Sequence, residues 1–330
     1  EKFYVEPVGA YRGLPSFHIH EDCNGNTWVH PYGGGFSYFD RKQNCLLPFY
    51  NNPLSADWKF SNKIHTAYSD RQGNLWMCTH SKGLEKISFI NSPFALVQLT
   101  KASNHESLAN EVRSLYEDSD RNMWVGLKDG YLRVYDINHK YLGFLTDRGV
   151  ISQQGTPLKG VAYALTQDSK GNIWIGMKGD GLIRATKKGN GYELTRFLTD
   201  ENDNYSLSDN NIYSIHEDAK GRIWIATFGG GINYIEPSPT EQVKFINYKN
   251  RLKGYPIDRC YRARYVTSDK SGRIWVGTTV GVLTFNSDFS APENIQFEHY
   301  VHSLTDANSI SNNDVHWIHV ARDGNIYFAT

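Results

Sequence analysis

Seven large side chains recur in this sequence at intervals of 48 to 52 residues, and all but one of them carry a polar or cationic group. They are Phe17, His65, Arg113, Tyr163, Tyr213, Arg264 and His316. Two positions further on, every copy has an aliphatic residue, so only the first position varies in its chemistry. Aromatic rings stack on the C–H faces of sugars, and polar groups hydrogen-bond to sugar hydroxyls. The set therefore predicts an oligosaccharide-binding ring; the alternative is that these side chains fill a channel and hydrogen-bond to one another.

Two members of this ring are arginines, Arg113 and Arg264, and no acidic residue occupies the same position in any copy. A guanidinium group matches a carboxylate or sulfate group with two parallel hydrogen bonds. Unpaired arginines would favour an acidic oligosaccharide that carries uronic acid or sulfate groups. Alternatively, Glu111, Asp314 or Asp129 pairs with them and leaves a neutral site.

The sequence contains no motif of a catalytic or metal site. GxSxG, HExxH and P-loop patterns are absent, and the 12 histidines include no pair four residues apart, the helical metal spacing of HExxH. We therefore expect no catalytic residue, no metal and no cofactor. The four cysteines form no CxxC pair and are expected to be small buried apolar residues, with a Cys23–Cys45 disulfide as the alternative in an oxidising compartment.

The elements that position the ring follow from an internal repeat. In six copies an Asp is followed six residues later by a Trp, and the seventh copy has Ala321 and Tyr327 in these places. The aromatic residue stands at positions 28, 76, 124, 174, 224, 275 and 327. We interpret the Asp as the start of a tight turn and the Trp as packing between repeats, because catalytic residues do not recur seven times in one chain.

The fifth copy shows how each repeat is predicted to fold. Residues 212–217 and 223–227 read as strands around a turn at 218–221, and residues 232–235 and 243–248 read as two further strands. Seven such units predict an all-β, seven-bladed β-propeller of four-stranded antiparallel blades, which forms a single domain over residues 1–330. The last copy is incomplete after its second strand, and residues 2–8 are a candidate for one of its outer strands.

One phrase of the repeat resembles a known family. The sequence Ser-Leu-Ser-Asp-Asn-Asn-Ile at 206–212, followed by His-Glu-Asp at 216–218 and Gly-Arg-Ile-Trp-Ile at 221–225, is similar to the two-component regulator propeller repeat. The last copy opens in the same way at 309–315. The resemblance implies the periplasmic sensor region of a hybrid two-component system, of the kind that gut Bacteroidetes use to detect glycan fragments. In that family two propellers precede a small β-domain, a membrane span and a kinase, so we expect a fragment of such a sensor or a stand-alone relative.

Composition bears on the class of partner. Lys plus Arg and Asp plus Glu both number 35, so no net field attracts nucleic acid or an anionic membrane. No stretch approaches the roughly 20 apolar residues that span a bilayer. We expect a non-enzymatic sensing module in the periplasm, whose partners are an oligosaccharide and the rest of a membrane-bound sensor kinase. The sequence leaves open whether the chain forms a homodimer. The alternatives are a propeller enzyme acting on polysaccharide, as a lyase or glycosidase, and a protein-interaction scaffold.

Overall fold

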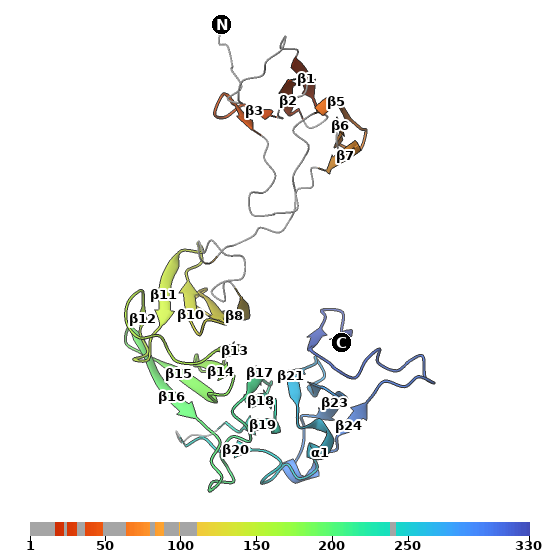
Figure 1. Ribbon diagram of the computed structural model, residues 1–330. Coiled ribbons are helices and arrows are strands. Elements are labelled where there is room, and N and C mark those ends of the chain that lie inside the picture. Colours follow the sequence, from red (N-terminus) through yellow and green to blue (C-terminus); the bar gives the residue numbers. More distant parts are fainter. Residues whose placement is uncertain are drawn as a thin grey trace. The chain divides into compact units, whose positions relative to one another are not determined.

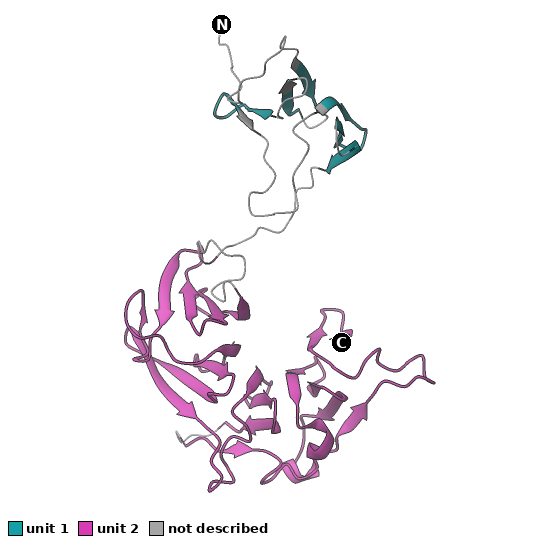
Figure 2. Cartoon of the chain, viewed as in Figure 1, with its two compact units in different colours: residues 1–97 teal, residues 98–330 magenta. Residues whose placement is uncertain are grey.

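The computed structural model describes residues 17–22, 25–31, 37–48, 64–79, 83–88, 99, 111–237 and 242–330. The chain forms two compact units, residues 1–97 and residues 98–330, which Figure 2 colours separately. Both units consist of antiparallel sheets, and the α-helix α1 (Ile257–Cys260) is only about one turn long. The candidate outer strand at residues 2–8 lies outside the described residues.

The N-terminal unit contains one four-stranded and one three-stranded sheet, which correspond to the first two predicted repeats. The first sheet consists of β1 (Phe17–Glu21), β2 (Thr27–Pro31), β3 (Ser37–Asp40) and β4 (Cys45–Pro48), and the second consists of β5 (Ile64–Ser69), β6 (Asn74–Thr79) and β7 (Gly83–Ser88). A 2.7 Å hydrogen bond between His20 Nε2 and Ser69 Oγ joins β1 to β5.

The C-terminal unit contains five sheets, one for each of the last five predicted repeats (Figure 1). The third repeat forms β8 (Val112–Glu117), β9 (Met123–Leu127), β10 (Leu132–Tyr135), β11 (Tyr141–Leu145) and β12 (Ile151–Ser152). The fourth forms β13 (Ala162–Gln167), β14 (Ile173–Met177), β15 (Leu182–Lys188) and β16 (Gly191–Phe197). The fifth forms β17 (Ile212–Glu217), β18 (Ile223–Thr227), β19 (Gly231–Ile235) and β20 (Phe245–Ile246). The sixth forms β21 (Ala263–Ser268), β22 (Arg273–Thr278), β23 (Gly281–Asn286) and, after the 3-10 helix η2 (Pro292–Asn294), β24 (Glu298–Tyr300); the seventh forms β25 (Trp317–Val320) and β26 (Ile326–Ala329).

These sheets confirm the predicted all-β fold built from four-stranded antiparallel sheets. Within each sheet the strands pair in chain order, as expected for strands joined by short turns. Three repeats differ: among its described residues the second forms three strands, β12 adds a fifth strand to the third, and the last forms two strands among its described residues. That the seven sheets close into one seven-bladed ring stays a prediction.

The recurring Asp and Trp hold the turn between the first two strands of each repeat. In all six Asp–Trp copies the Trp Nε1 donates a hydrogen bond of 2.8–2.9 Å to the Asp Oδ2. The other Asp oxygen accepts backbone N–H groups of the turn, for example that of Asn172 at 2.8 Å from Asp168. The Asp therefore has the predicted structural role, and the bond to the indole joins it to the core.

The Trp side chains lie in the contact between neighbouring sheets, as predicted. Trp224 has no exposed surface, and its ring centre lies 4.5 Å from that of Tyr234 in its own repeat. On the other side the centre of Phe285, on β23 of the next sheet, lies 5.2 Å away. Trp124 is likewise fully buried and belongs to the core between the third and fourth sheets. Burial of these rings is the main force that packs the sheets together.

The cysteines depart from the prediction at one position. Cys260 is buried, but Cys78 is exposed and Cys45 is half-buried. The prediction of uniformly buried cysteines is wrong for Cys78, because successive side chains of β6 alternate between two faces and this one points away from the core. Cys45 has a free thiol, and the alternative of a Cys23–Cys45 disulfide involves Cys23, which lies outside the described residues.

Candidate functional site

The predicted ring residues occupy a special backbone position at the start of the first strand of their repeats. Ile212 pairs with Thr227 and Ser214 pairs with Ala226, so Tyr213 is an extra residue in β17. The same shift in register occurs around His65, Arg113, Tyr163 and Arg264. Such a β-bulge bends the strand and redirects the side chain of the extra residue. The bulge explains why the ring position varies in chemistry while the position two residues later stays aliphatic.

The first strands of the C-terminal unit lie next to one another in chain order. β13 packs against β8 and β17, and β21 packs against β17 and β25. Figure 1 shows these strands on the inner side of their sheets, with β16, β20 and β24 on the outer side. Because the bulges fall at equivalent places on adjacent strands, their side chains reach one common face.

On this face three aromatic side chains, Tyr163, Tyr213 and Phe228, form a continuous row, here called the aromatic row. The ring centres of Tyr163 and Tyr213 lie 5.3 Å apart at an angle of 62°. Tyr213 and Phe228 are stacked, with centres 4.7 Å apart and planes inclined by 18°. Arg113 lies over Tyr163 at 5.5 Å, and Arg264 lies over Phe228 at 5.0 Å. The row thus contains side chains from two sheets and is flanked by arginines from two more.

Both flanking arginines have acidic partners, so the prediction of unpaired guanidinium groups is wrong. Arg113 pairs with Glu111, which also lies 2.9 Å from the Nζ of Lys128. Arg264 donates to both oxygens of Asp314, at 2.8 and 3.2 Å. The two acids stand outside the ring position, two residues before Arg113 and His316 in their own repeats, where a comparison of the ring position alone does not find them.

The remaining predicted ring residues differ in where the structure places them. His316 is exposed, precedes β25, and its Nε2 lies 3.3 Å from Asp314 Oδ2, so it joins the cluster at Arg264. His65 is exposed on β5 of the N-terminal unit, which is described separately from the unit that carries the aromatic row. Phe17 begins β1, and its side chain is not among the described ones. The structure therefore assembles Arg113, Tyr163, Tyr213, Arg264 and His316.

Two further cations that the ring position does not contain lie beside the aromatic row. Lys178, in the loop after β14, lies 5.5 Å from the centre of Tyr163. Arg262, directly before β21, lies 5.4 Å from the centre of Phe228 and 5.1 Å from that of Tyr261. Arg262 occupies the same place in its repeat as Glu111 and Asp314, which the sequence already offered as candidate partners, so a comparison of the copies at that place would have added Arg262.

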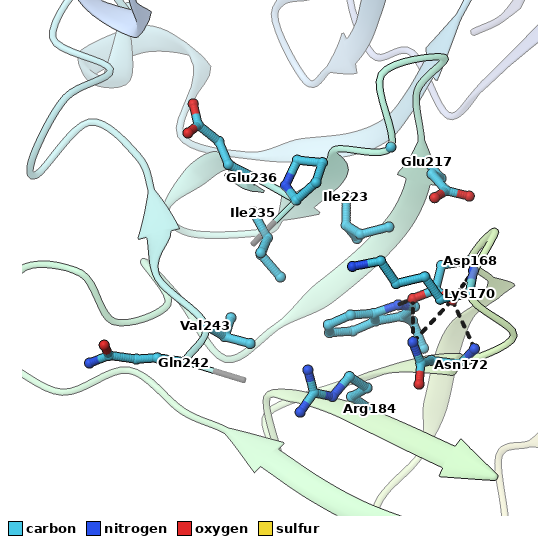
Figure 3. A pocket seen from close by; sticks show the side chains of 13 residues that line it. Asp168, Lys170, Asn172, Arg184, Glu217, Ile223, Ile235, Glu236, Gln242 and Val243 are labelled. Atoms are coloured by element: carbon cyan, nitrogen blue, oxygen red, sulfur yellow. Dashed lines mark hydrogen bonds between the residues drawn. The ribbon is translucent and has the colours of Figure 1, made fainter. Parts of the chain in front are cut away.

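A cavity of about 220 Å³ lies at the opposite end of the strands, between the sheet β13–β16 and the sheet β17–β20 (Figure 3). Its wall includes Trp174 and Arg184 of the first sheet and Ile223 and Ile235 of the second. Lys170, in the turn before β14, also lines it. The cavity is separate from the face that carries the aromatic row, because Tyr163 and Tyr213 stand at the other ends of β13 and β17.

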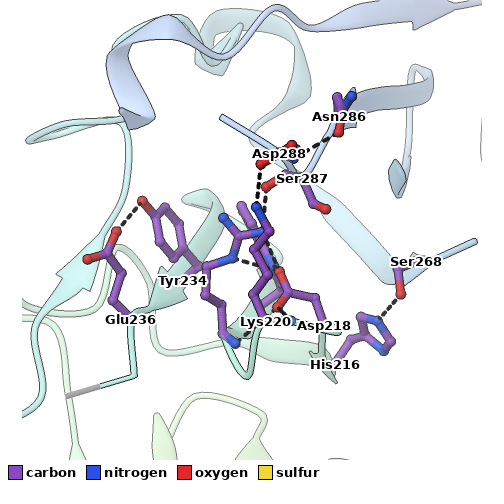
Figure 4. Close-up of polar contacts among 11 residues, drawn as sticks. His216, Asp218, Lys220, Tyr234, Glu236, Ser268, Asn286, Ser287 and Asp288 are labelled. Atoms are coloured by element: carbon purple, nitrogen blue, oxygen red, sulfur yellow. Dashed lines mark hydrogen bonds and ion pairs between the residues drawn. The ribbon is translucent and has the colours of Figure 1, made fainter. Parts of the chain in front are cut away.

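A polar network joins the fifth and sixth sheets on the turn side (Figure 4). Buried Arg222 donates from Nε to Asp218 Oδ2 and from Nη2 to the Ser287 carbonyl, both at 2.7 Å. Burial acts to raise the pKa of Asp218, but hydrogen bonds from Trp224 and Arg222 outweigh it and hold the pKa below its ordinary value.

His216 belongs to the same network. Its Nε2 lies 2.7 Å from Ser268 Oγ, in the same arrangement as His20 and Ser69 of the first two repeats. Burial lowers the pKa of His216, although the charge of Asp218 opposes this shift. The imidazole is therefore kept neutral in the contact between the sheets near neutral pH.

The described residues show neither a metal site nor a membrane segment. No group of three or more His, Cys, Asp and Glu side chains is arranged there to hold a metal ion. Across the same residues, no helix combines the length and the apolar character needed to cross a bilayer.

Comparisons with known proteins identify the repeat. The family model described as "Two component regulator propeller" matches residues 59–81, 107–129, 158–179 and 206–229. The extracellular domain of the hybrid two component system BT3049 from B. thetaiotaomicron is similar, with a TM-score of 0.55 and 23% identity over 96% of this chain and 40% of that chain. A corresponding domain of BT4673 from the same bacterium gives a TM-score of 0.49 and 17% identity over 94% of this chain and 45% of that chain.

Virginiamycin B lyase from Staphylococcus aureus, crystallised as an inactive variant with quinupristin, gives a TM-score of 0.47 and 14% identity over 96% of this chain and 91% of that chain. A comparison with curated proteins gave no match. The chain spans less than half the length of the two B. thetaiotaomicron domains. The family matches confirm the resemblance of the repeat, and the likeness to the BT3049 domain shows the fold.

Proposed function

Because four of its repeats match the two component regulator propeller model, we propose that this chain is the ligand-sensing part of a periplasmic sensor. In this proposal it binds a glycan fragment and passes the change to the rest of a membrane-bound hybrid two-component regulator. The similar B. thetaiotaomicron structures are extracellular domains of hybrid two component systems, which supports a sensor role outside the cytoplasm.

The aromatic row is the observation that carries the proposed glycan site. Tyr163 and Tyr213 are half-buried, and within the described part of the chain their hydroxyls make no hydrogen bond, so they are available to a ligand. Partly exposed aromatic rings beside polar groups provide both contacts that a pyranose needs, namely a surface for its C–H groups and donors for its hydroxyls. These groups come from several repeats at once, as a ligand longer than one sugar unit requires.

The charges on this face favour an uncharged oligosaccharide. Arg113 and Arg264 form ion pairs with Glu111 and Asp314, so the expectation of an acidic ligand can no longer rest on two unpaired arginines. Lys178 and Arg262 have no acidic partner among the described residues, but the neighbouring loops carry Asp180 and Asp209, which equally lack a cationic one. Paired guanidinium and carboxylate groups still donate and accept hydrogen bonds at their free edges, which suits vicinal hydroxyls.

Calorimetric titration with neutral and acidic oligosaccharides of two to four units tests this proposal. We expect Tyr213→Ala to weaken a neutral ligand about three- to tenfold, because an aromatic contact contributes about 0.5–1.5 kcal/mol. Tyr163→Ala and His316→Ala should act in the same direction, and affinity should change little with salt. Tyr205→Ala, which removes an exposed ring away from the row, is the matched control. Unchanged affinity in all three site variants, for a ligand that binds the parent chain, would exclude the site.

The same experiment addresses the enzymatic alternative. A lyase or glycosidase needs a free acid and base on one face. The two carboxylates that stand next to the ring position, those of Glu111 and Asp314, are held in ion pairs with Arg113 and Arg264. We therefore propose that the bound oligosaccharide is released intact, and chromatography of the ligand after long incubation should show no shortened product.

A further inference from the structure

The cavity between the fourth and fifth repeats contains a guanidinium group without a hydrogen-bond partner. The Nε of Arg184, on β15, is buried and makes no hydrogen bond. Its guanidinium carbon lies 6.0 Å from the ring centre of Trp174 and 5.9 Å from that of Phe197, so two aromatic rings hold it in place. A buried donor that stays unsatisfied costs free energy and calls for an explanation.

A second cation enters the same space. Lys170 lines the cavity, and no ion pair of its ammonium group is found among the described residues. Figure 3 shows the Lys170 and Arg184 side chains extending toward the interior of the cavity. A volume of about 220 Å³ is far larger than the roughly 30 Å³ that one water molecule occupies in the liquid.

The acidic residues around this cavity are already satisfied. Glu217 accepts hydrogen bonds from the backbone N–H and the hydroxyl of Ser169, at 2.7 and 2.6 Å. Asp168 accepts from the Trp174 indole and from Asn172. Glu236 accepts from the Tyr234 hydroxyl at 3.2 Å, and in Figure 3 the carboxylates of Glu217 and Glu236 are turned away from the interior. These hydrogen bonds come from neutral donors, and neither Lys170 nor Arg184 forms an ion pair with the three carboxylates among the described residues.

We propose that this cavity binds a small oxyanion, a carboxylate, sulfate or phosphate group, between Arg184 and Lys170. The planar fork of Arg184 matches two oxygens of such a group, and stacking on Trp174 and Phe197 fixes its orientation before binding. Lys170 adds a point charge from the turn. The site is independent of the proposed glycan site, since it lies at the other end of the strands and uses none of the same residues.

The test is a titration of the full chain with inorganic sulfate, and separately with inorganic phosphate and acetate, at constant ionic strength set with sodium chloride. The readout is the Trp174 indole N–H resonance in ¹H–¹⁵N spectra, assigned with Trp174→Phe. We expect a saturable shift with a dissociation constant on the order of 1 mM, as two charge-assisted hydrogen bonds would give. The anion that binds tightest identifies the oxyanion class.

Variants separate the site from general salt effects. Arg184→Gln and Lys170→Gln should each weaken binding about tenfold, because each removes one charge-assisted contact. Arg196→Gln is the matched control, since Arg196 on the neighbouring strand β16 contacts only backbone carbonyls. A linear shift without saturation, or equal dissociation constants in the parent chain and both site variants, would overturn the proposal. Tyr213→Ala should leave the sulfate titration unchanged, so failure of the glycan site and failure of this site give different results.

Discussion

Truncation of Trp224 is the sharpest test of how the sheets are held together. Trp224→Ala removes a ring with no exposed surface that contacts Tyr234 in its own sheet and Phe285 in the next. Removal of a buried aromatic side chain costs about 3–5 kcal/mol of unfolding free energy. The upper part of this range is expected here, because Asp218 also loses the indole N–H that donates to it at 2.8 Å.

Two further variants help to interpret this cost: one separates the packing contribution from the hydrogen bond, and the other is a control. Trp224→Phe keeps most of the packing but removes the hydrogen bond, and should cost about 1–3 kcal/mol. Trp317→Ala is the matched control, because Trp317 is 54% exposed and contacts mainly Tyr265, so its loss should cost about 1 kcal/mol. Urea unfolding followed by far-UV circular dichroism gives all three values. If Trp224→Ala unfolded at the same urea concentration as Trp317→Ala, the assignment of the Trp to the contact between sheets would be refuted.

Two further predictions concern acid stability and the tight turns. Burial holds the pKa of His216 in the folded chain below its ordinary value of 6.5, so the unfolded chain takes up the proton first as the pH falls. The free energy of unfolding should therefore be constant above about pH 6.5 and fall below it. His216→Gln should reduce this fall. Equal pH profiles of the unfolding midpoint in the parent chain and in this variant would contradict the assignment. Gly171 has a φ of 85°, and a Cβ there would meet no atom within 4 Å, so Gly171→Ala should cost about 1–2 kcal/mol through backbone strain alone; an unchanged thermal midpoint would show that this turn relaxes.

Most of the fold could be predicted from the sequence because of its internal repeat. Val112, Leu115 and Tyr116 have the spacing of a helix, yet the equivalent residues of other copies read as strand, and the segment is indeed β8. Comparison between copies succeeds here because each repeat must bury the same faces against its neighbours. The turn chemistry was predictable for the same reason, since Asp and Gly recur at fixed offsets.

The candidate site was less predictable because it depends on contacts between repeats. The pairing of Arg264 with Asp314 joins residues 50 positions apart; the sequence offered Asp314 as one of three candidate partners, and the structure shows which arginine it pairs with. The bulge at Tyr213 is a change in strand register, which side-chain types alone do not specify. The unsatisfied Nε of Arg184 likewise follows only from the packing around it.

The bulges have a consequence for how such a protein can diversify. A bulged residue stands outside the regular pairing of its strand, so its side chain can change without altering the ladder or the buried positions that follow it. Under the proposed function, folding and recognition are thereby assigned to different residues of the same strand. The five bulged side chains can be exchanged while the scaffold stays intact. A library randomised only at these five positions should yield folded variants in high proportion. The five bulged residues in the described part of the chain are His65, Arg113, Tyr163, Tyr213 and Arg264.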